Sequence, residues 1–403
     1  MNSNTGADEK QALAFELAPL PKLITGPGTI YSVPDLLKQK GYARTALITG
    51  GKSYSGAVYR DEFEHALRRA GLEFRHFQVS GEPSPDTVDA IGDVCRRDEI
   101  TGVLAVGGGS VIDTGKAVAA MQCHAGSVAE YLEGVGDKTP GGNRVPLSAI
   151  PTTSGTGSEA TKNAVISRVG SGGYKKSLRH EGFIPDLAVL DPEVVLHCPA
   201  EITAAAGMDA LTQLLEAFVS TKASPFTDAL AADGLRRAAW ALPEVIRDGA
   251  SVTARSQMAY AAYISGVCLA NAGLGVVHGA ASPAGALRKI PHGVVCGTLL
   301  PSATEVIISA LLKGGTSDRT GLEKYSAAAV VLTGRDRGTP ELNCGALVEL
   351  LYQWADDFGM PGLSDYGFTL QDLERISSQS SLKATPVDLD REEIYQILKK
   401  RLF

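Results

Sequence analysis

The segment Gly102–Ala119, GVLAVGGGSVIDTGKAVA, joins an apolar run to a helical pattern through three consecutive glycines. Gly102–Val106 predicts a buried strand, and Ser110–Met121 predicts a helix with Ser110 at its N-cap. Glycines let a ligand approach the backbone closely, and a helix N-terminus offers free N–H groups to a phosphate. The segment therefore favours a phosphate-binding strand–turn–helix unit, although a tight turn without a ligand has the same pattern.

The same alternation of strands and helices extends on both sides of this segment. The predicted strands are Thr45–Thr49, Glu73–Phe77, Asn163–Arg168 and Leu187–Leu190, and the predicted helices are Tyr59–Ala70 and Thr87–Arg97. Alternation at this spacing predicts a parallel sheet with crossover helices. The first half of the chain is therefore expected to be an α/β domain.

After Asp191 and Pro192 the pattern becomes helical, with Ala-rich segments of 3.6-residue period. These segments are Ala204–Val219, Thr227–Ile246, Val252–Leu269, Ala303–Leu312, Gly321–Leu332, Cys344–Phe358 and Arg391–Leu402. We predict a disordered N-terminus over residues 1–12, an α/β domain over 13–192 and an all-helical domain over 193–403. We expect the two domains to pack closely with a cleft between them.

A second loop also follows a predicted strand. The segment Ser148–Thr161, SAIPTTSGTGSEAT, gathers hydroxyl groups and backbone donors after an apolar run. A polar surface turn would look similar. Two such loops at the carboxyl ends of strands in one sheet favour a diphosphate ligand, as in a dinucleotide-binding domain.

A third loop, Gly50-Gly51-Lys52-Ser53, follows the first predicted strand and bears on the choice of nucleotide. NAD-specific sites place an acidic side chain near such a turn, where it binds the ribose hydroxyls and repels a 2′-phosphate. No acid is present in this loop. Lys52 and Ser53 are therefore expected to bind the phosphate of NADP(H), which we favour over NAD(H); a solvated lysine is the alternative.

The only histidines in the second half of the chain, His278 and His292, lie in one segment, GLGVVHGAASPAGALRKIPHG. Upstream, Asp209 in GMDALTQLLEAFVS can supply a carboxylate. One carboxylate and two neutral imidazoles suit Fe(II) or Zn(II). The alternatives are two core histidines satisfied by backbone carbonyls and an acid at a helix N-terminus favoured by the helix dipole.

The composition of the chain argues against several classes of protein, including nucleic-acid-binding and membrane proteins. The chain of 403 residues is 44% hydrophobic and 21% charged, as in ordinary globular proteins, and its net charge of −7 argues against nucleic-acid binding. No apolar run approaches membrane-spanning length, and the polar N-terminus does not look like a signal peptide. Six cysteines without a CxxC pair indicate free thiols and a cytoplasmic location.

Taken together, GGGSVIDTGKA, PTTSGTGSE, GMDALTQLLEAFVS and GLGVVHG…PHGVVCGTLLP resemble the iron-containing (group III) alcohol dehydrogenase family. They occur in the family's order, and the likeness runs from Phe15 to the C-terminal helix. The resemblance implies a Rossmann-like dinucleotide-binding domain, a helical metal domain of the dehydroquinate synthase-like kind, and hydride transfer between NAD(P)(H) and an alcohol/aldehyde or ketone pair. It also implies a homodimer or larger homo-oligomer.

The resemblance implies specific cofactor contacts. By position, these are Gly107, Gly108, Gly109, Ser110, Asp113, Thr152, Thr153, Thr156 and Lys175. Lys176 is the alternative register for the lysine, which is expected to reach the cofactor ribose. Pro83 and Pro85 match a PxP turn near the nicotinamide, with Ser84 between them.

The metal ligands match the family less completely. The family pattern has Asp, a His four residues later, and two histidines fourteen residues apart; Asp209, His278 and His292 match, whereas Gln213 replaces the first His. Residues i and i+4 share a helix face, so Gln213 is either an oxygen ligand or a neighbour of a metal-bound water. Ser282 replaces a histidine thought to relay a proton, so the proton is expected to leave through the ribose hydroxyls, Ser282 and water.

We therefore predict a metal-dependent alcohol dehydrogenase or aldehyde reductase. Its candidate catalytic residues are Asp209, His278, His292 and Ser282. Arg288 and Lys289 either attract an anionic substrate or form a solvated rim, and Cys296 is either a reactive or a buried structural thiol. Two other functions stay open. One is a dehydroquinate synthase-like lyase or cyclase that recycles NAD internally, and the other is a non-catalytic nucleotide-binding relative; net NAD(P)H consumption would exclude both.

Overall fold

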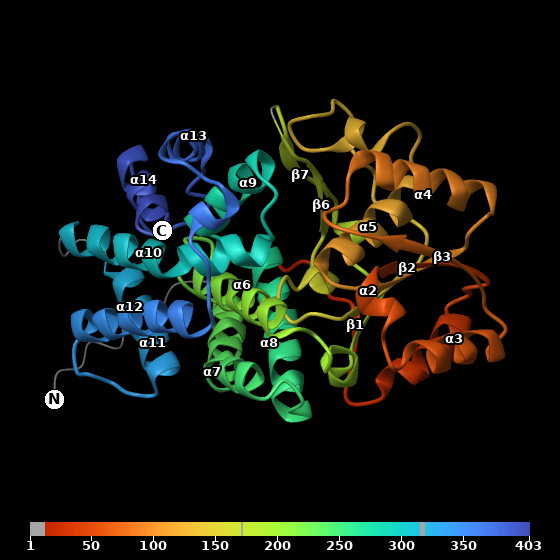
Figure 1. Cartoon of the computed structure of the whole chain (residues 1–403), viewed down its shortest axis with the longest axis horizontal. Helices are drawn as coiled ribbons and strands as arrows, with labels where there is room; N and C mark the ends of the chain where they lie inside the picture. Colours follow the sequence, from red (N-terminus) through yellow and green to blue (C-terminus); the bar gives the residue numbers. More distant parts are fainter. Residues whose placement is uncertain (1–12, 171, 315–318) are drawn as a thin grey trace.

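The computed structural model describes residues 13–170, 172–314 and 319–403, so the prediction for residues 1–12 lies outside the described residues. Two domains lie side by side (Figure 1). The first, coloured red to yellow, contains the strands, and the second, coloured green to blue, consists of helices. The predicted fold class, an α/β domain followed by a helical domain, is confirmed.

The described residues of the first domain form a six-stranded parallel sheet with the order β1-β8-β5-β4-β2-β3. The strands are β1 (Lys22–Thr25), β2 (Arg44–Gly50), β3 (Glu73–Val79), β4 (Gly102–Gly107), β5 (Leu147–Pro151) and β8 (Leu187–Leu190). The helices of this domain are α1 (Val33–Gln39), α2 (Lys52–Ser55), α3 (Arg60–Arg69), α4 (Pro85–Arg97) and α5 (Gly109–Met121). Since all strands run parallel, the loops after β2, β4 and β5 meet at one edge of the sheet.

Two strands stand apart from this sheet. β6 (Asn163–Arg168), which was predicted as a further strand of the α/β pattern, pairs only with β7 (Tyr174–Arg179), in antiparallel register. No crossover helix lies between β5 and β6 in the structure, only the three-residue 3-10 turn Ser158–Ala160. A parallel return needs a long crossover, so the chain forms a hairpin instead. This hairpin packs on α5 and against the helical domain, between the two domains (Figure 1).

The second domain packs its helices around one apolar core. They are α6 (Ala200–Phe218), α7 (Pro225–Arg247), α8 (Val252–Ala272), α9 (Val276–Leu287), α10 (His292–Lys313), α11 (Thr320–Thr333), α12 (Pro340–Asp357), α13 (Leu370–Gln379) and α14 (Arg391–Lys399). Helices α9 and α13 and the first half of α10 were not predicted. α9 and α10 contain Pro283 and Pro301, and their mostly buried surfaces show little of the apolar–polar period that reveals an amphipathic helix.

Helix α10 corrects one expectation. By length and composition alone, this helix could cross a membrane, whereas the sequence analysis predicts no apolar run of that length. In the structure, 72% of its most apolar window is buried inside the protein, as for the central helix of a folded core. Helices α8 and α9 pass the same test only as a pair bent by 99°. Burial by the surrounding helices accounts for the apolar character of α10.

The six cysteines are free thiols, as predicted. Cys95, Cys268, Cys296 and Cys344 are buried, and Cys123 is exposed. Buried cysteines usually act as small apolar side chains, and three of these four contribute to the cores away from the cleft described below. The cytoplasmic location inferred from these thiols stays a prediction.

Candidate active site

A cleft of about 510 Å³ lies between the two domains. Many of the residues predicted from the sequence line it. From the α/β domain they are Gly109, Ser110, Asp113, Thr156 and Lys175, and from the helical domain Gln213, His278, Ser282 and His292. The fold therefore brings the predicted phosphate loop and the predicted metal ligands to opposite sides of one cavity.

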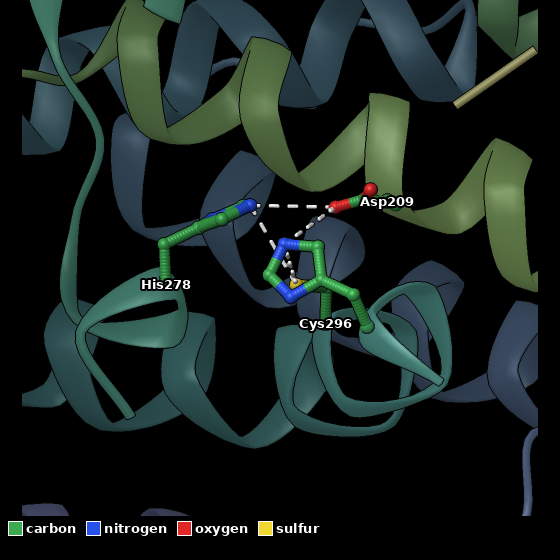
Figure 2. A group of neighbouring side chains, drawn as sticks. Asp209, His278 and Cys296 are labelled. Atoms are coloured by element: carbon green, nitrogen blue, oxygen red, sulfur yellow. Dashed lines mark hydrogen bonds and ion pairs between the residues drawn. The ribbon is translucent and has the colours of Figure 1, made fainter. Parts of the chain in front are cut away.

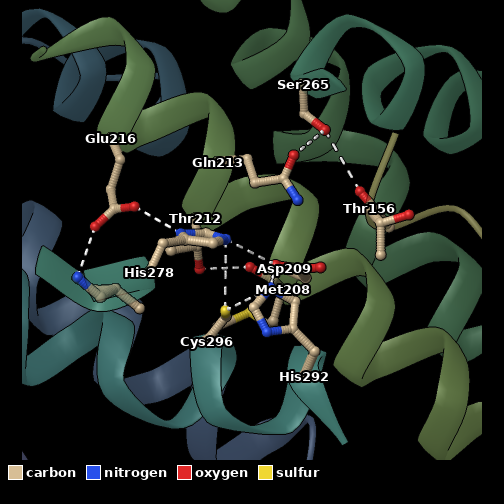
Figure 3. Close-up of polar contacts among 12 residues, drawn as sticks. Thr156, Met208, Asp209, Thr212, Gln213, Glu216, Ser265, His278, His292 and Cys296 are labelled. Carbon is tan, nitrogen blue, oxygen red and sulfur yellow. Dashed lines mark hydrogen bonds and ion pairs between the residues drawn. The ribbon is translucent and has the colours of Figure 1, made fainter. Parts of the chain in front are cut away.

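The helical side of the cleft holds a compact group of potential metal ligands. They are Asp209, His278 and Cys296 (Figure 2), together with His292 (Figure 3). Their ligand atoms all lie within 4.8 Å of one another. His278 Nε2 is 3.3 Å, and His292 Nε2 3.9 Å, from Asp209 Oδ1. Asp209 lies in the middle of the 19-residue helix α6, so the alternative of an acid at a helix N-terminus is wrong.

His278 is oriented by a second carboxylate that sequence reasoning missed. Glu216 Oε2 lies 2.6 Å from His278 Nδ1, and Glu216 Oε1 accepts the backbone N–H of Val277 at 2.8 Å (Figure 3). A proton on Nδ1 leaves Nε2 free to bind a metal, which is the usual arrangement around metal-binding histidines. Glu216 follows Asp209 by two helical turns, a spacing that places both on one face of α6. His278 is therefore held by carboxylates and not by backbone carbonyls.

The group has the unpaired atoms expected of a metal site. Among the described residues, Asp209 Oδ1 and His292 Nδ1 are buried without a hydrogen-bond partner. Buried polar atoms are almost always paired, so an unpaired buried carboxylate oxygen facing two imidazoles needs an explanation. A divalent cation with carboxylate and imidazole ligands provides one, and the residues present therefore fit a metal ion.

The charges of the group depend on one another. Burial would raise the pKa of Asp209, but the imidazoles of His292 and His278 outweigh it and lower that pKa to about 2. Burial opposes a charge on His278, yet Cys296, Glu216 and Asp209 hold its pKa well above the usual value. Burial raises the pKa of Cys296 to about 12. Without a cation, the carboxylates thus retain a proton on His278, and a bound cation would replace it.

Gln213 lies one helical turn after Asp209 and lines the cleft, as its position predicts. Its Oε1 lies 3.1 Å from Ser265 Oγ, within hydrogen-bond distance of that hydroxyl (Figure 3). Ser265 Oγ also lies 2.7 Å from the carbonyl of Ala262. The side chain is thus tied to α8, and its role as a metal ligand stays a prediction.

The opposite side of the cleft is formed by two loops that fit closely together. A Cβ on Gly109 would lie 2.6 Å from Thr156 Oγ1, and one on Gly107 would lie 2.5 Å from Val111 Cγ2. Thr152 donates its N–H to the carbonyl of Gly107 at 3.0 Å. The packing of the protein itself therefore requires glycine at positions 107 and 109, whether or not a ligand is bound.

The start of α5 differs from the prediction in one respect. The helix begins at Gly109 with Gly108 at its N-cap, so Ser110 lies in the first turn and is not the N-cap. Gly108 has no side chain that could cap the helix, and a Cβ added at this position would lie 3.3 Å from Thr153 Oγ1. A cap without a side chain leaves the first N–H groups of α5 facing the cleft, where they can bind a phosphate.

Asp113 lines the cleft but is engaged by the protein itself. It accepts the hydroxyl of Ser158 at 2.5 Å and the N–H of Val165 at 3.0 Å. The fully buried Lys116, which sequence reasoning missed, donates at 2.8 Å to Ser158, to Thr161 and to the carbonyl of residue 163. Asp113 and Lys116 therefore hold the second loop and the hairpin on α5, so the predicted cofactor contact of Asp113 stays a prediction.

The predicted lysine of the hairpin faces the cleft. Lys175 lines the cavity and forms an ion pair with Glu82, whereas Lys176 is exposed, so Lys175 is the register that points inward. Pro83 of the PxP turn also lines the cavity. Ser84 accepts the N–H of residue 87 and caps α4, which begins at Pro85.

The remaining predicted residues lie away from this cavity lining. Gly50 ends β2, Gly51 is the N-cap of α2, and Lys52 and Ser53 lie in that short helix, at the sheet edge shared with the glycine loop. Arg288 forms an ion pair with Asp372 at 2.7 Å and is not among the residues found to line the cleft. This favours the alternative of a solvated rim for Arg288, because its charge is already balanced by Asp372.

Comparison with known proteins assigns the family. The profile of iron-containing alcohol dehydrogenases matches residues 21–192, and that of the family's C-terminal part matches residues 203–402. The chain belongs to the iron-containing alcohol dehydrogenase family. It is 31% identical to an NAD-dependent methanol dehydrogenase of Bacillus methanolicus over 399 residues, covering 95% of this chain and 98% of the relative. It is 36% identical over 282 residues to a 1,3-propanediol dehydrogenase of Klebsiella pneumoniae, covering 68% and 71%.

Solved structures of this family have the same fold. A 1,3-propanediol oxidoreductase superposes with a TM-score of 0.88 at 29% identity, covering 96% of this chain and 100% of the other. A sulfoacetaldehyde reductase from Bifidobacterium kashiwanohense, in complex with NAD+, superposes with a TM-score of 0.83 at 25% identity, covering 97% and 99%. As a member of this family, the chain is a metal-dependent NAD(P) oxidoreductase of alcohols, and the lyase and the non-catalytic alternatives are disfavoured.

Proposed function

We propose that Asp209, His278 and His292 hold one divalent ion, Fe(II) or Zn(II), beside which a small aldehyde or ketone is interconverted with its alcohol by hydride transfer from NADPH. The observation that carries this proposal is the buried carboxylate oxygen without a hydrogen bond, set between two imidazoles. When bound, the ion would supply Lewis-acid polarisation of the substrate oxygen. We further propose that Gln213 marks a subgroup of the family in which glutamine replaces one metal-binding histidine.

The residues of the chain have distinct proposed tasks. The N–H groups of Gly109 and Ser110, at the start of α5, bind the pyrophosphate with help from Thr156. Lys175, facing the cleft from β7, positions the ribose. Ser282, one turn after His278 on α9, lines the cleft and passes the proton between the reacting oxygen, the ribose hydroxyls and water.

Metal dependence tests this proposal directly. The protein is stripped with a chelator and reloaded anaerobically with Fe(II) or Zn(II), and NADPH oxidation is followed by absorbance with a panel of small aldehydes. We expect turnover to disappear on stripping and to return with one of the two ions. Unchanged turnover after complete removal of metal, verified by elemental analysis, would contradict the proposal.

We also propose that the chain prefers NADPH, unlike those relatives whose names state NAD. The turn after β2 holds Gly50, Gly51, Lys52 and Ser53, with no carboxylate to repel a 2′-phosphate and with one cation to attract it. Gly51→Asp should reverse this preference, because the new carboxylate would face the 2′-phosphate of NADPH, and like charges brought together in this way cost several kcal/mol. The affinity for NADPH should therefore fall at least tenfold relative to that for NADH. The affinities of wild type and variant for the two nucleotides, measured by fluorescence, test this. A wild-type preference for NADH would overturn the proposal.

We further propose that the substrate carries an anionic group. The helical end of the cleft is lined by Lys222 and Lys383, and among the described residues neither lies within ion-pair distance of a carboxylate. These two lysines replace Arg288 and Lys289 as the proposed anion-binding residues. One structural neighbour is named as a reductase of sulfoacetaldehyde, a sulfonate.

The test compares sulfoacetaldehyde with a neutral aldehyde of similar length. A hydrogen bond to a charged group contributes about 1.5–3 kcal/mol, so Lys383→Met should raise KM for the anionic aldehyde about tenfold or more. The neutral aldehyde serves as the internal control and should be little affected. Equal kcat/KM for the two aldehydes in the wild type would contradict an anionic substrate.

An oligomer is proposed as well. The extended segment before β1 exposes Leu13, Phe15, Leu17 and Leu20, and β1 is an edge strand of the sheet. Apolar side chains beside an unpaired strand edge favour association with another copy. Light scattering of the purified chain should give the mass of a dimer or larger assembly, and a monomeric mass at micromolar concentration would contradict this.

A further inference from the structure

Helix α10 contributes a second potential ligand to the metal group. Cys296 follows His292 by four residues, so both side chains lie on one face of α10. Its Sγ lies 3.6 Å from His278 Nε2 and 3.7 Å from His292 Nε2, and the side chain is fully buried. Figures 2 and 3 show the sulfur pointing at the same point as the two imidazoles and Asp209. The thiol therefore belongs both to the surrounding apolar core and to the group of potential metal ligands.

The distances agree with four ligands around one ion. In a tetrahedral site with metal–sulfur bonds of about 2.3 Å and metal–nitrogen bonds of about 2.0–2.1 Å, sulfur and nitrogen ligands lie roughly 3.5 Å apart. Carboxylate oxygen and nitrogen ligands lie roughly 3.3 Å apart in the same geometry. The two sulfur–nitrogen distances are 3.6 and 3.7 Å, and the distance from Asp209 Oδ1 to His278 Nε2 is 3.3 Å. Of these four distances, that from Asp209 to His292, 3.9 Å, is longer than this geometry requires.

Gln213 is the competing candidate for the fourth position. Its Oε1 is already within 3.1 Å of Ser265 Oγ, on the side of α8. An amide oxygen is also a neutral ligand, whereas a thiolate binds zinc and similar ions strongly. Cys296, by contrast, contacts the two imidazole nitrogens that face the proposed ion.

We infer that Cys296 is the fourth protein ligand of the metal, so that this ligand comes from α10 where the family pattern takes it from α6. The inference rests on the metal site of the proposed function. On binding, a metal–sulfur bond forms, the S–H bond of Cys296 breaks, and the proton leaves to solvent. The resulting ligand set is one thiolate, one carboxylate and two imidazoles, and its two negative charges match a divalent ion.

Cobalt reports such a ligand without relying on turnover. Metal-stripped, reduced protein is titrated anaerobically with Co(II), and its near-ultraviolet absorption is recorded. We expect one equivalent of Co(II) to give an intense thiolate-to-cobalt charge-transfer band. Cys296→Ser should lose this band and bind Co(II) at least tenfold more weakly, since even residues that only support a ligand cost 10–100-fold in affinity when mutated.

A matched control is Cys268→Ser, which alters another buried thiol of the helical domain and should keep the band. If Cys296→Ser does not fold, X-ray absorption of the zinc-loaded wild type gives the same answer, with one sulfur expected at about 2.3 Å. Rescue sharpens the assignment. Adding Gln213→His to Cys296→Ser should restore Co(II) affinity, without the charge-transfer band.

The outcomes separate this inference from the proposed function. A wild-type protein that binds Co(II) without the band, or a band that persists in Cys296→Ser, overturns the role of Cys296 while leaving metal-dependent turnover untouched. A band that depends on Cys296 supports the inference even if no aldehyde is reduced. In that case the dehydrogenase proposal fails and the metal site stands.

Discussion

The two sides of the cleft differ in how their buried polar groups are satisfied. On the nucleotide side, formed by the glycine loop, the second loop and α5, the buried Lys116 donates three hydrogen bonds of 2.8 Å, and Asp113 accepts two. On the metal side, formed by Asp209, His278, His292 and Cys296, two buried atoms have no hydrogen-bond partner among the described residues. On the nucleotide side Asn163 Oδ1 also lacks a hydrogen-bond partner within the described part of the chain, but the charged groups Lys116 and Asp113 have theirs. On the metal side an oxygen of the charged Asp209 has none.

This difference separates structural from functional polar groups. Folding selects partners for buried charges, so a network with all its hydrogen bonds made needs no ligand. Buried carboxylate and imidazole atoms left without a hydrogen bond at a cavity contradict that tendency, and such exceptions concentrate at functional sites. Substitutions on the metal side should therefore change chemistry and metal affinity, whereas those on the nucleotide side should change nucleotide affinity and stability.

The largest expected effect is that of Asp209→Ala. Loss of the carboxylate removes a ligand and, with it, several kcal/mol of charge stabilisation by the metal, so kcat/KM should fall at least about 10³-fold. NADPH binding, measured by fluorescence, should be unchanged because the nucleotide side is intact. Asp357→Ala, at the exposed end of α12, is the control and should keep full activity. Full activity of Asp209→Ala would end the metal assignment.

Glu216→Gln should have the next largest effect. The amide is neutral and has one acceptor oxygen, whereas Glu216 uses two, for Val277 N–H and for His278 Nδ1. His278 is therefore held less firmly, and metal affinity should fall 10–100-fold. The metal dissociation constant is measured by competition with a chromophoric chelator. Glu201→Gln, in the exposed first turn of the same helix, should leave it unchanged. Equal affinities in both variants would mean that Glu216 only supports packing.

The sequence predicted the nucleotide side well because its signals are local. The triple glycine follows a fully apolar strand, and the order of strands and helices places its loop at the sheet edge. The antiparallel hairpin was not predicted because β7, with the sequence YKKSLR, lacks the apolar run of a buried strand. Its partner β6 therefore looked like part of the parallel sheet.

The metal side was predicted only in part. Asp209, His278 and His292 were found because they match a family pattern, and the structure brings them together. Glu216 was missed, and Cys296 was considered only as a reactive or a structural thiol and not as a metal ligand. Each lies on the same helix face as a predicted ligand. Long-range proximity between α6, α9 and α10 is a result of tertiary packing, and no spacing in the sequence states it.

The nucleotide side contains a buried acid, Glu159, whose charge state tests how well the neighbouring Lys116 stabilises a buried carboxylate. Burial raises its pKa from 4.5 to about 7, with Lys116 acting in the opposite direction. Between these two pH values the unfolded chain releases the proton that the folded chain keeps, so stability falls as pH rises through this window and stays lower above it.

Glu159→Gln should remove this decline, a difference on the order of 2 kcal/mol between pH 5 and pH 8. Urea unfolding of wild type and variant at the two pH values measures it. Glu349→Gln, on the exposed face of α12, is the control and should follow the wild type. An identical pH dependence in Glu159→Gln would show that Lys116 keeps Glu159 ionised in the folded protein.

The smallest effect expected is that of Gly109→Ala, which tests whether packing on the nucleotide side sets nucleotide affinity. The new Cβ would lie 2.6 Å from Thr156 Oγ1, so the second loop must shift away from the start of α5. Overpacking of this kind costs about 1–3 kcal/mol, so NADPH should bind about tenfold more weakly while metal affinity is unchanged. Gly345→Ala is the control, because a Cβ there meets no atom within 4 Å. Weakened metal binding in Gly109→Ala would show that the two sides of the cleft are coupled, and that the separation drawn between them does not hold.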